Sequence, residues 1–94
     1  MEQTIIELDD KDVITITIDF EPIPLIILKT QKGYIMNDYL DISAANKLRH
    51  VAGKVLKVTT ISQALNASVV QLSEKALKKG LKPGIKVRNF FNLI

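Results

Sequence analysis

The chain has 94 residues, of which 47% are hydrophobic and 24% are charged, as is typical of one globular domain spanning residues 1–94. It contains no cysteine, which excludes disulfides, thiolate nucleophiles and thiolate metal sites. The net charge of +3 is uneven, because residues 1–46 hold nine acids and three lysines whereas residues 47–94 hold ten bases and one acid.

The absence of cysteine also favours a reducing compartment, since small secreted domains commonly need disulfides. The polar, acidic start Met1–Thr4 is unlike a signal peptide. No apolar run approaches the ~20 residues of a membrane-spanning helix. We therefore predict a cytoplasmic protein with no membrane partner.

The amino-terminal third has the pattern of β-strands. Weak alternation predicts a strand over residues 4–8, and clear alternation predicts one over residues 13–20. One face of the second strand is hydrophobic: Ile14, Ile16, Ile18 and Phe20. We expect this face to form the floor of the core. Residues 25–28 are typical of a central strand, and residues 34–36 return after a hairpin loop at 30–33.

The remainder is predicted to be mostly helical. Asp38 or Asp41 can cap a first helix that ends at Gly53, and residues 54–59 follow as a fifth strand. Two capping boxes come next: Thr60 with Gln63, and Ser68 with Gln71. They predict helices over residues 61–66 and 69–79. A terminal helix should bury one face: Val87, Phe90, Phe91 and Ile94.

These elements predict an α+β fold of two layers. A mainly antiparallel sheet of four or five strands comes from residues 1–60. Three or four helices should cover one of its faces. The chain contains no internal repeat, low-complexity tract or linker.

Several short motifs follow one another along the chain: Lys32-Gly33-Tyr34-Ile35-Met36 with Leu40-Asp41, Ala52-Gly53, Thr60-Ile61 and Gly80-Leu81-Lys82-Pro83-Gly84. From about Leu25 to the end, this order resembles the YunC-like family of small bacterial and archaeal proteins, a domain of unknown function. The resemblance implies a compact two-layer α/β domain without an established activity, so no catalytic residue is transferred. Members often have Cys-Gly where Asn37-Asp38 stands here, so a thiol-based role would not extend to this chain.

A small enzyme would have to use Asp38, Asp41 and His50, because general acid–base chemistry needs a histidine or paired carboxylates. Both aspartates also suit helix capping, and His50 suits the solvated side of the first helix. Hydrolase, P-loop and dinucleotide motifs are missing. One histidine without cysteine cannot form a structural zinc site, so we expect neither a metal nor a cofactor. We rank an enzyme third.

Nucleic-acid binding is the alternative function. Six basic residues fall within fourteen positions: Lys75, Lys78, Lys79, Lys82, Lys86 and Arg88. Such a cluster can bind backbone phosphates, and the release of counterions favours this binding. Aromatic residues, on which bases could stack, are only 5% of the chain, however. Lysines on the outer face of a helix are usually ordinary solvated surface residues.

Self-association requires no special residues, and we rank it first among the three functions. A sheet edge made by residues 3–8 or 13–20 can pair with its own copy. The acidic and basic halves supply charge complementarity that would orient such a pair. We therefore predict a non-catalytic interaction or accessory protein that forms homo-oligomers, and specifically a dimer.

Overall fold

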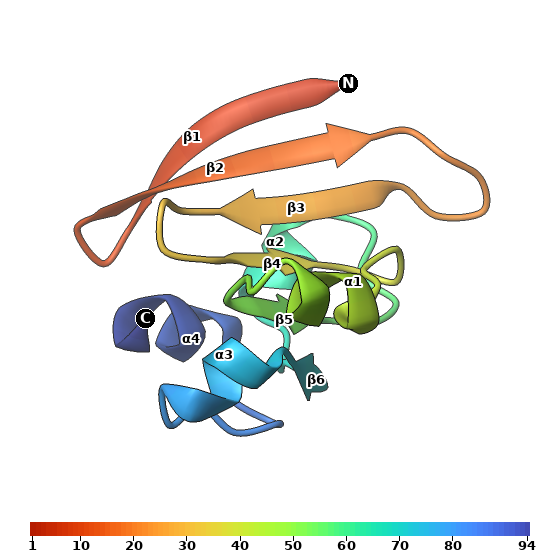
Figure 1. Ribbon diagram of the computed structural model, residues 1–94. Coiled ribbons are helices and arrows are strands. Elements are labelled where there is room, and N and C mark those ends of the chain that lie inside the picture. Colours follow the sequence, from red (N-terminus) through yellow and green to blue (C-terminus); the bar gives the residue numbers. More distant parts are fainter.

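Six strands form one mixed sheet in the computed structural model, which describes residues 1–94. Their order in space is their order in the chain, β1 to β6 (Figure 1). Neighbouring strands are antiparallel except β4 and β5, which are parallel because helix α1 connects them. The elements are β1 (Glu2–Leu8), β2 (Lys11–Ile18), β3 (Leu25–Lys29), β4 (Tyr34–Met36), α1 (Ile42–Lys47), β5 (Ala52–Lys54), α2 (Ile61–Leu65), β6 (Gln71–Leu72), α3 (Glu74–Lys78) and α4 (Val87–Leu93).

The main core lies on one side of this sheet, which we call the covered face. The first four strands contribute five buried apolar residues to it: Leu8, Val13, Ile26, Leu28 and Ile35. Ala64 of α2 and the two phenylalanines of α4 belong to the same cluster. The rings of Phe90 and Phe91 meet edge to face with centroids 5.2 Å apart. Helices α2 and α4 therefore seal this side.

Helix α1 packs on the opposite side, but only over β4 and β5. A smaller cluster forms there from Leu40, Ala45 and Ala52, with Tyr34, Met36 and Ile42 packed against it. In Figure 1, α1 lies in front of β4 and β5, and no helix lies in front of β1, β2 and β3. We call this uncovered side of β1–β3 the open face. None of the four helices is long and apolar enough to cross a membrane.

The α+β class is confirmed, but the predicted sheet had too few strands and lacked the parallel pair. It has six strands rather than four or five, extends to Leu72 rather than ending near residue 60, and includes one parallel pair. Helices also lie on both faces rather than one. The edge prediction is confirmed for residues 3–8, whereas residues 13–20 do not form an edge because β2 lies between β1 and β3.

The helix predicted over residues 69–79 is wrong in its first half. The amides of Val69, Val70 and Ser73 donate to the carbonyls of Ile85, Lys54 and Ala52, so this backbone joins the sheet and its surroundings. Only α3 remains helical, and its cap is Ser73 rather than Ser68. These backbone partners lie 16 to 21 residues away in the chain. A local pattern of apolar residues could not indicate them.

The first helix and the fifth strand are also displaced from their predicted bounds. Helix α1 ends at Lys47, and the strand occupies Ala52–Lys54 rather than 54–59. Gly53 lies inside the strand instead of ending the helix. A Cβ there would lie 2.8 Å from Ile35 Cδ1 and 2.9 Å from Val69 Cγ1, so close packing of the core requires glycine at this position.

The structure also reverses the predicted faces of β2. Val13 is fully buried and Thr15 is 4% exposed, whereas Ile14, Ile16 and Ile18 lie on the open face and Phe20 is 50% exposed. The register explains the reversal, because β2 pairs its threonines with the buried side of β3: Thr15 with Leu28, and Thr17 with Ile26. The hydroxyl of Thr15 donates to the carbonyl of Thr4 at 3.2 Å, which lets this polar group be buried.

Two predicted helix starts are confirmed. Asp41 caps α1 by accepting hydrogen bonds from the amides of Ser43 and Ala44, and Thr60 caps α2 by accepting from the amide of Gln63. The reciprocal bond of the Thr60–Gln63 box shifts by one residue, since Gln63 Oε1 accepts from the amide of Thr59 at 2.8 Å. Capping depends on neighbours three residues apart, which makes it readable from local sequence.

Candidate functional site

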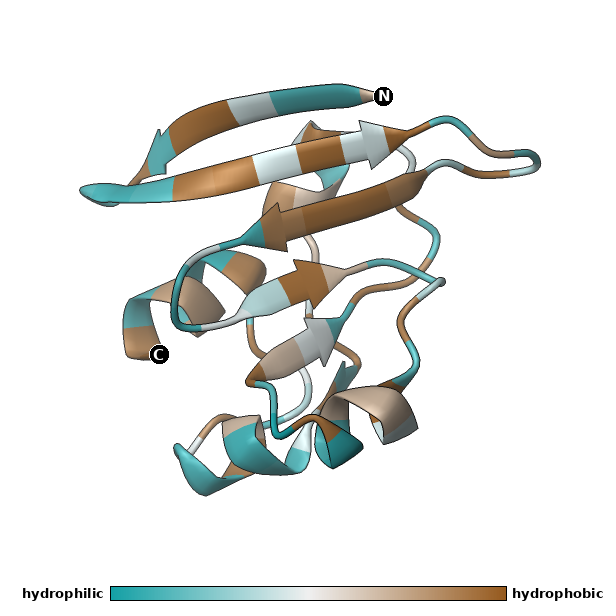
Figure 2. Ribbon diagram, turned by 45° about the horizontal axis from the view of Figure 1, so that its top comes forward, coloured by the Kyte–Doolittle hydropathy of each residue, from teal (hydrophilic) through white to brown (hydrophobic).

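The open face carries a continuous group of aliphatic side chains. Residues paired across strands share a face of the sheet, and the pairs here are Ile5 with Ile14, Ile16 with Ile27, and Ile18 with Leu25. Ile5 is 63% exposed and the other five are partly exposed. Figure 2 shows hydrophobic segments along β2 and β3. These six residues form one apolar surface across three strands.

Different groups border the open face at its two ends. Phe20 and Tyr39 lie beyond the end of β2, with ring centroids 5.6 Å apart, and both are exposed. At the other end, Glu7 pairs with Asp12, while Lys29 pairs with Ile14. All three charged residues share the face of the aliphatic group. The face thus has an acidic corner on β1 and β2 and a basic corner on β3.

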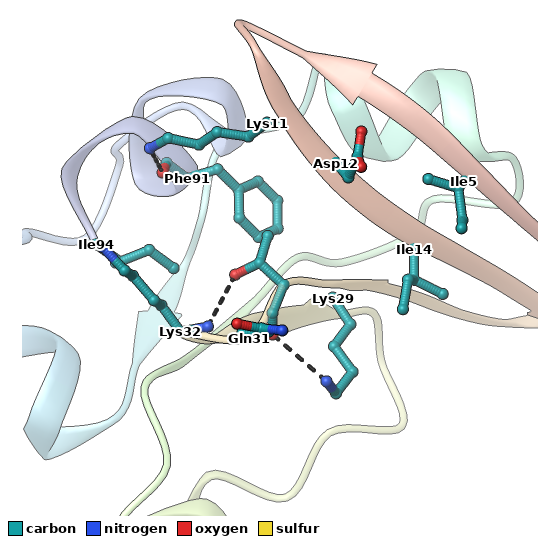
Figure 3. A pocket seen from close by; sticks show the side chains of 10 residues that line it. Ile5, Lys11, Asp12, Ile14, Lys29, Gln31, Lys32, Phe91 and Ile94 are labelled. Atoms are coloured by element: carbon teal, nitrogen blue, oxygen red, sulfur yellow. Dashed lines mark hydrogen bonds between the residues drawn. The ribbon is translucent and has the colours of Figure 1, made fainter.

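A hollow of about 450 Å³ continues the open face at its charged end (Figure 3). Its apolar lining comes from Ile5 and Ile14 of the sheet and from Phe91 and Ile94 at the carboxyl end of the chain. Lys11 Nζ donates to the carbonyl of Phe91 and so ties β2 to α4. Apolar surface therefore reaches from the sheet to the last helix.

Asp38, Asp41 and His50 each have a separate structural partner. Asp38 Oδ1 accepts from the amide of Lys57 at 2.8 Å, and Asp41 caps α1. His50 follows the end of that helix, where its Nδ1 lies 2.9 Å from the hydroxyl of Tyr34. No hollow in the structure is lined by more than one of the three. The structure does not bring them together as a site.

The six predicted nucleic-acid contacts are also divided. Lys75 and Lys78 of α3 line a hollow with Arg49 and His50, which follow α1. The others are exposed and line none of the hollows: Lys79, Lys82, Lys86 and Arg88. No group of three or more His, Cys, Asp or Glu side chains is gathered in a way that could hold a metal ion.

Tyr34 was not among the candidate residues. Its hydroxyl meets His50, the two rings stand edge to face at 5.4 Å, and it lines a second hollow with Lys29, Lys32 and Arg49. Burial raises the pKa of Tyr34 above its ordinary value. A lone tyrosine in a short strand gives no signal of this pairing, because its partner lies 16 residues further along the chain.

The chain is a small α+β domain with a mixed sheet. One face of β1–β3 is apolar and uncovered, and basic residues gather around the hollow beside Tyr34. Residues 36–94 match a family model described as a domain of unknown function, DUF1805. The chain belongs to this family, which confirms the resemblance to the YunC-like proteins.

A crystal structure described as a protein of unknown function, TA1206 from Thermoplasma acidophilum, is similar over nearly the whole chain. The identity is 34%, the TM-score is 0.92, and the match covers 97% of this chain and 89% of that one. No curated protein matches this chain. The family match begins at Met36, whereas the similar crystal structure also spans the region of β1–β3.

Proposed function

We propose that the protein is a non-catalytic accessory protein that works as a homodimer, with the open faces of two copies packed against each other. The observation that carries this proposal is the row of six aliphatic side chains on an uncovered sheet face. Removing apolar surface from water stabilises association by about 25 cal/mol per Å². In a single chain, the six aliphatic side chains of the open face stay exposed to water.

A second copy of the chain suits the face better than an unrelated partner because its charges complement each other. In a two-fold arrangement whose axis runs along β2, β1 of one copy lies over β3 of the other. Glu7 of the acidic corner then lies one register position from Lys29 of the second copy, and the reverse contact forms as well, while Asp12 lies near the axis opposite Asp12 of the second copy. No charged side chain lies among the six aliphatic residues, so their burial leaves no unpaired charge.

Light scattering at several protein concentrations tests the proposal. We expect a mass twice that of the 10.5 kDa chain. Ile5→Lys should reduce this to the mass of one chain, because it places a charge in the interface. Leu48→Lys is the matched control, since Leu48 is 64% exposed against 63% for Ile5 and lies outside the open face. A single-chain mass for the unaltered protein at high concentration would overturn the proposal, as would equal masses for the two variants.

Nucleic-acid binding through the basic residues of 75–88 stays a prediction. The same measurement with a short RNA added tests it directly. Binding through this segment should be lost at high salt and in a variant that changes Lys78, Lys79 and Lys82 to Glu, because phosphate contacts depend on counterion release. Unchanged scattering on adding RNA at low salt would contradict this alternative.

A further inference from the structure

Two adjoining hollows form a groove in which basic side chains outnumber acidic ones. One has a volume of about 330 Å³ and the other about 450 Å³. Arg49, His50 and Lys75 line both, so we treat the two as one feature and call it the basic groove. The remaining charged or aromatic lining residues are Lys29, Lys32, Tyr34, Glu74 and Lys78. Its volume is within the range of small-molecule sites, about 300–1,000 Å³.

The charges of the groove are unbalanced. Five lysine and arginine side chains line it against one carboxylate, that of Glu74. They come from three separate segments: the end of β3 with its following loop, the residues after α1, and α3. Like charges brought together repel one another, and a bound anion would relieve this repulsion. The groove therefore has the electrostatic character of an anion site.

The backbone conformation of Arg49 is one that glycine usually occupies. After α1, the amide of His50 donates to the carbonyl of Ala45 at 2.9 Å and that of Arg49 to Asn46 at 3.1 Å. This is a Schellman ending, in which the residue with positive φ is usually glycine. Here that residue is Arg49, with φ of 59°. The chain thus holds a guanidinium at the groove in a conformation that disfavours any side chain.

Buried contacts hold the walls of the groove in place. Ser73 is fully buried, and its hydroxyl donates to the carbonyl of His50 at 2.7 Å while accepting from the amide of Ala52 at 3.0 Å. Asn46 Oδ1 accepts from the amide of Glu74 at 2.8 Å, which joins α1 to α3. At Gly33, a Cβ would lie 2.6 Å from the carbonyl oxygen of Val51, so glycine permits the lysine-bearing loop to approach. The backbone that carries the side chains of the groove is therefore held in place by these contacts.

We infer that the basic groove binds the dianionic phosphate of a small phosphorylated molecule, with Arg49 as its main contact and Lys75 as a second. A guanidinium suits phosphate because its fork of donors matches two oxygens at once. His50 adds a ring N–H donor. When the Tyr34 hydroxyl donates to Nδ1, the ring proton lies on Nε2 and is free to meet a ligand oxygen.

A small ligand suits the groove better than a nucleic acid. Four of the basic residues in 75–88 do not line it, so it does not continue as a track along that segment. Its one tyrosine is already engaged with His50 and offers no free platform for stacked bases. A set of cations that line one groove instead matches a terminal phosphate, which carries about two charges at neutral pH.

Titration calorimetry with inorganic phosphate, ribose 5-phosphate, ribose and a twelve-nucleotide single-stranded RNA tests the inference. We expect both phosphate compounds to bind and ribose to give no heat. Arg49→Gly should weaken phosphate binding at least tenfold, and Lys75→Gln several-fold. Arg49→Gly should not lower the Tm, because glycine is favoured at positive φ. This separates loss of binding from loss of folding.

Lys57→Gly is the matched control. Lys57 also has a positive φ, 62°, and loses the same charge on substitution, but it lies outside the groove. Its phosphate affinity should change less than twofold. Equal affinities for Arg49→Gly and the unaltered protein would overturn the inference, as would absence of phosphate binding. RNA that binds tenfold more tightly than ribose 5-phosphate and depends on Arg49 would overturn it in favour of nucleic acid. Ile5→Lys should retain phosphate binding, so a failed dimer and a failed phosphate site are distinguishable.

Discussion

Both faces of β2 and β3 carry hydrophobic residues, yet only one of the two faces is sealed by helices. Leu28 is fully buried on the covered face, while its neighbour Ile27 is partly exposed on the open face. On β2 the contrast is inverted, because Thr15 is buried and Ile14 is not. Strand alternation thus identifies which residues share a face, but the placement of the helices decides which face becomes the core.

The difference matters for function because hydrophobic residues that a fold leaves uncovered are candidates for an interface. Ile14, Ile16 and Ile18 were predicted to form the floor of the core, and the prediction was wrong about the face. Sequence reasoning tends to fail at functional sites, since these are the places where a fold departs from its own packing rules. The three isoleucines that β2 leaves partly exposed therefore support the proposed dimer.

The largest expected effect comes from truncating the two neighbours on β3. Leu28→Ala should lower the free energy of unfolding by about 2–5 kcal/mol, because it leaves a cavity in the sealed core. Ile27→Ala should cost about 1 kcal/mol in a dilute sample, since little buried surface is lost. Urea denaturation at low and high protein concentration measures both. If the proposed dimer forms, only the loss for Ile27→Ala should grow with concentration; equal losses in the dilute sample would contradict the assignment of faces.

Local features of the fold could be predicted from sequence, and distant ones could not. Asp41 and Thr60 were identified as capping residues because a cap joins atoms only a few residues apart. Strand β6 was missed because its backbone pairs with β5, 17 to 19 residues earlier in the chain. Ser73 looked like an ordinary helix residue, although it joins three segments from a fully buried position.

The basic groove shows the same limit for a site. Lys75 and Lys78 were candidates because they belong to a visible run of lysines. Lys29 and Lys32 lie in the acidic half of the sequence and gave no such signal, although they line the same groove. Arg49 was hidden for another reason, since a Schellman ending is normally recognised by glycine and this one carries arginine.

A smaller effect is expected where the covered face is packed most closely. Gly53→Ala places a methyl group 2.8 Å from Ile35 Cδ1 and 2.9 Å from Val69 Cγ1, so these side chains must move. Overpacking of this kind costs about 1–3 kcal/mol. Thermal unfolding followed by circular dichroism would show the loss as a lower Tm. An unchanged or higher Tm would mean that the covered face holds free volume, and its contrast with the open face would then be weaker than described.

The smallest effect is expected at Thr15, where a polar residue occupies the covered face. Thr15→Val keeps the shape of the side chain, adds apolar surface and removes the hydrogen bond to the carbonyl of Thr4. That carbonyl belongs to the edge strand, so the two changes should nearly cancel and alter the free energy of unfolding by about 1 kcal/mol or less. Thr17→Val on the same face is the matched control without a hydroxyl bond to β1. If Thr15→Val alone proved strongly destabilising, the hydroxyl would be the reason that β2 turns this face inward. A near-neutral result would instead leave helix placement as the reason, with the isoleucines of the other face free to meet a second copy.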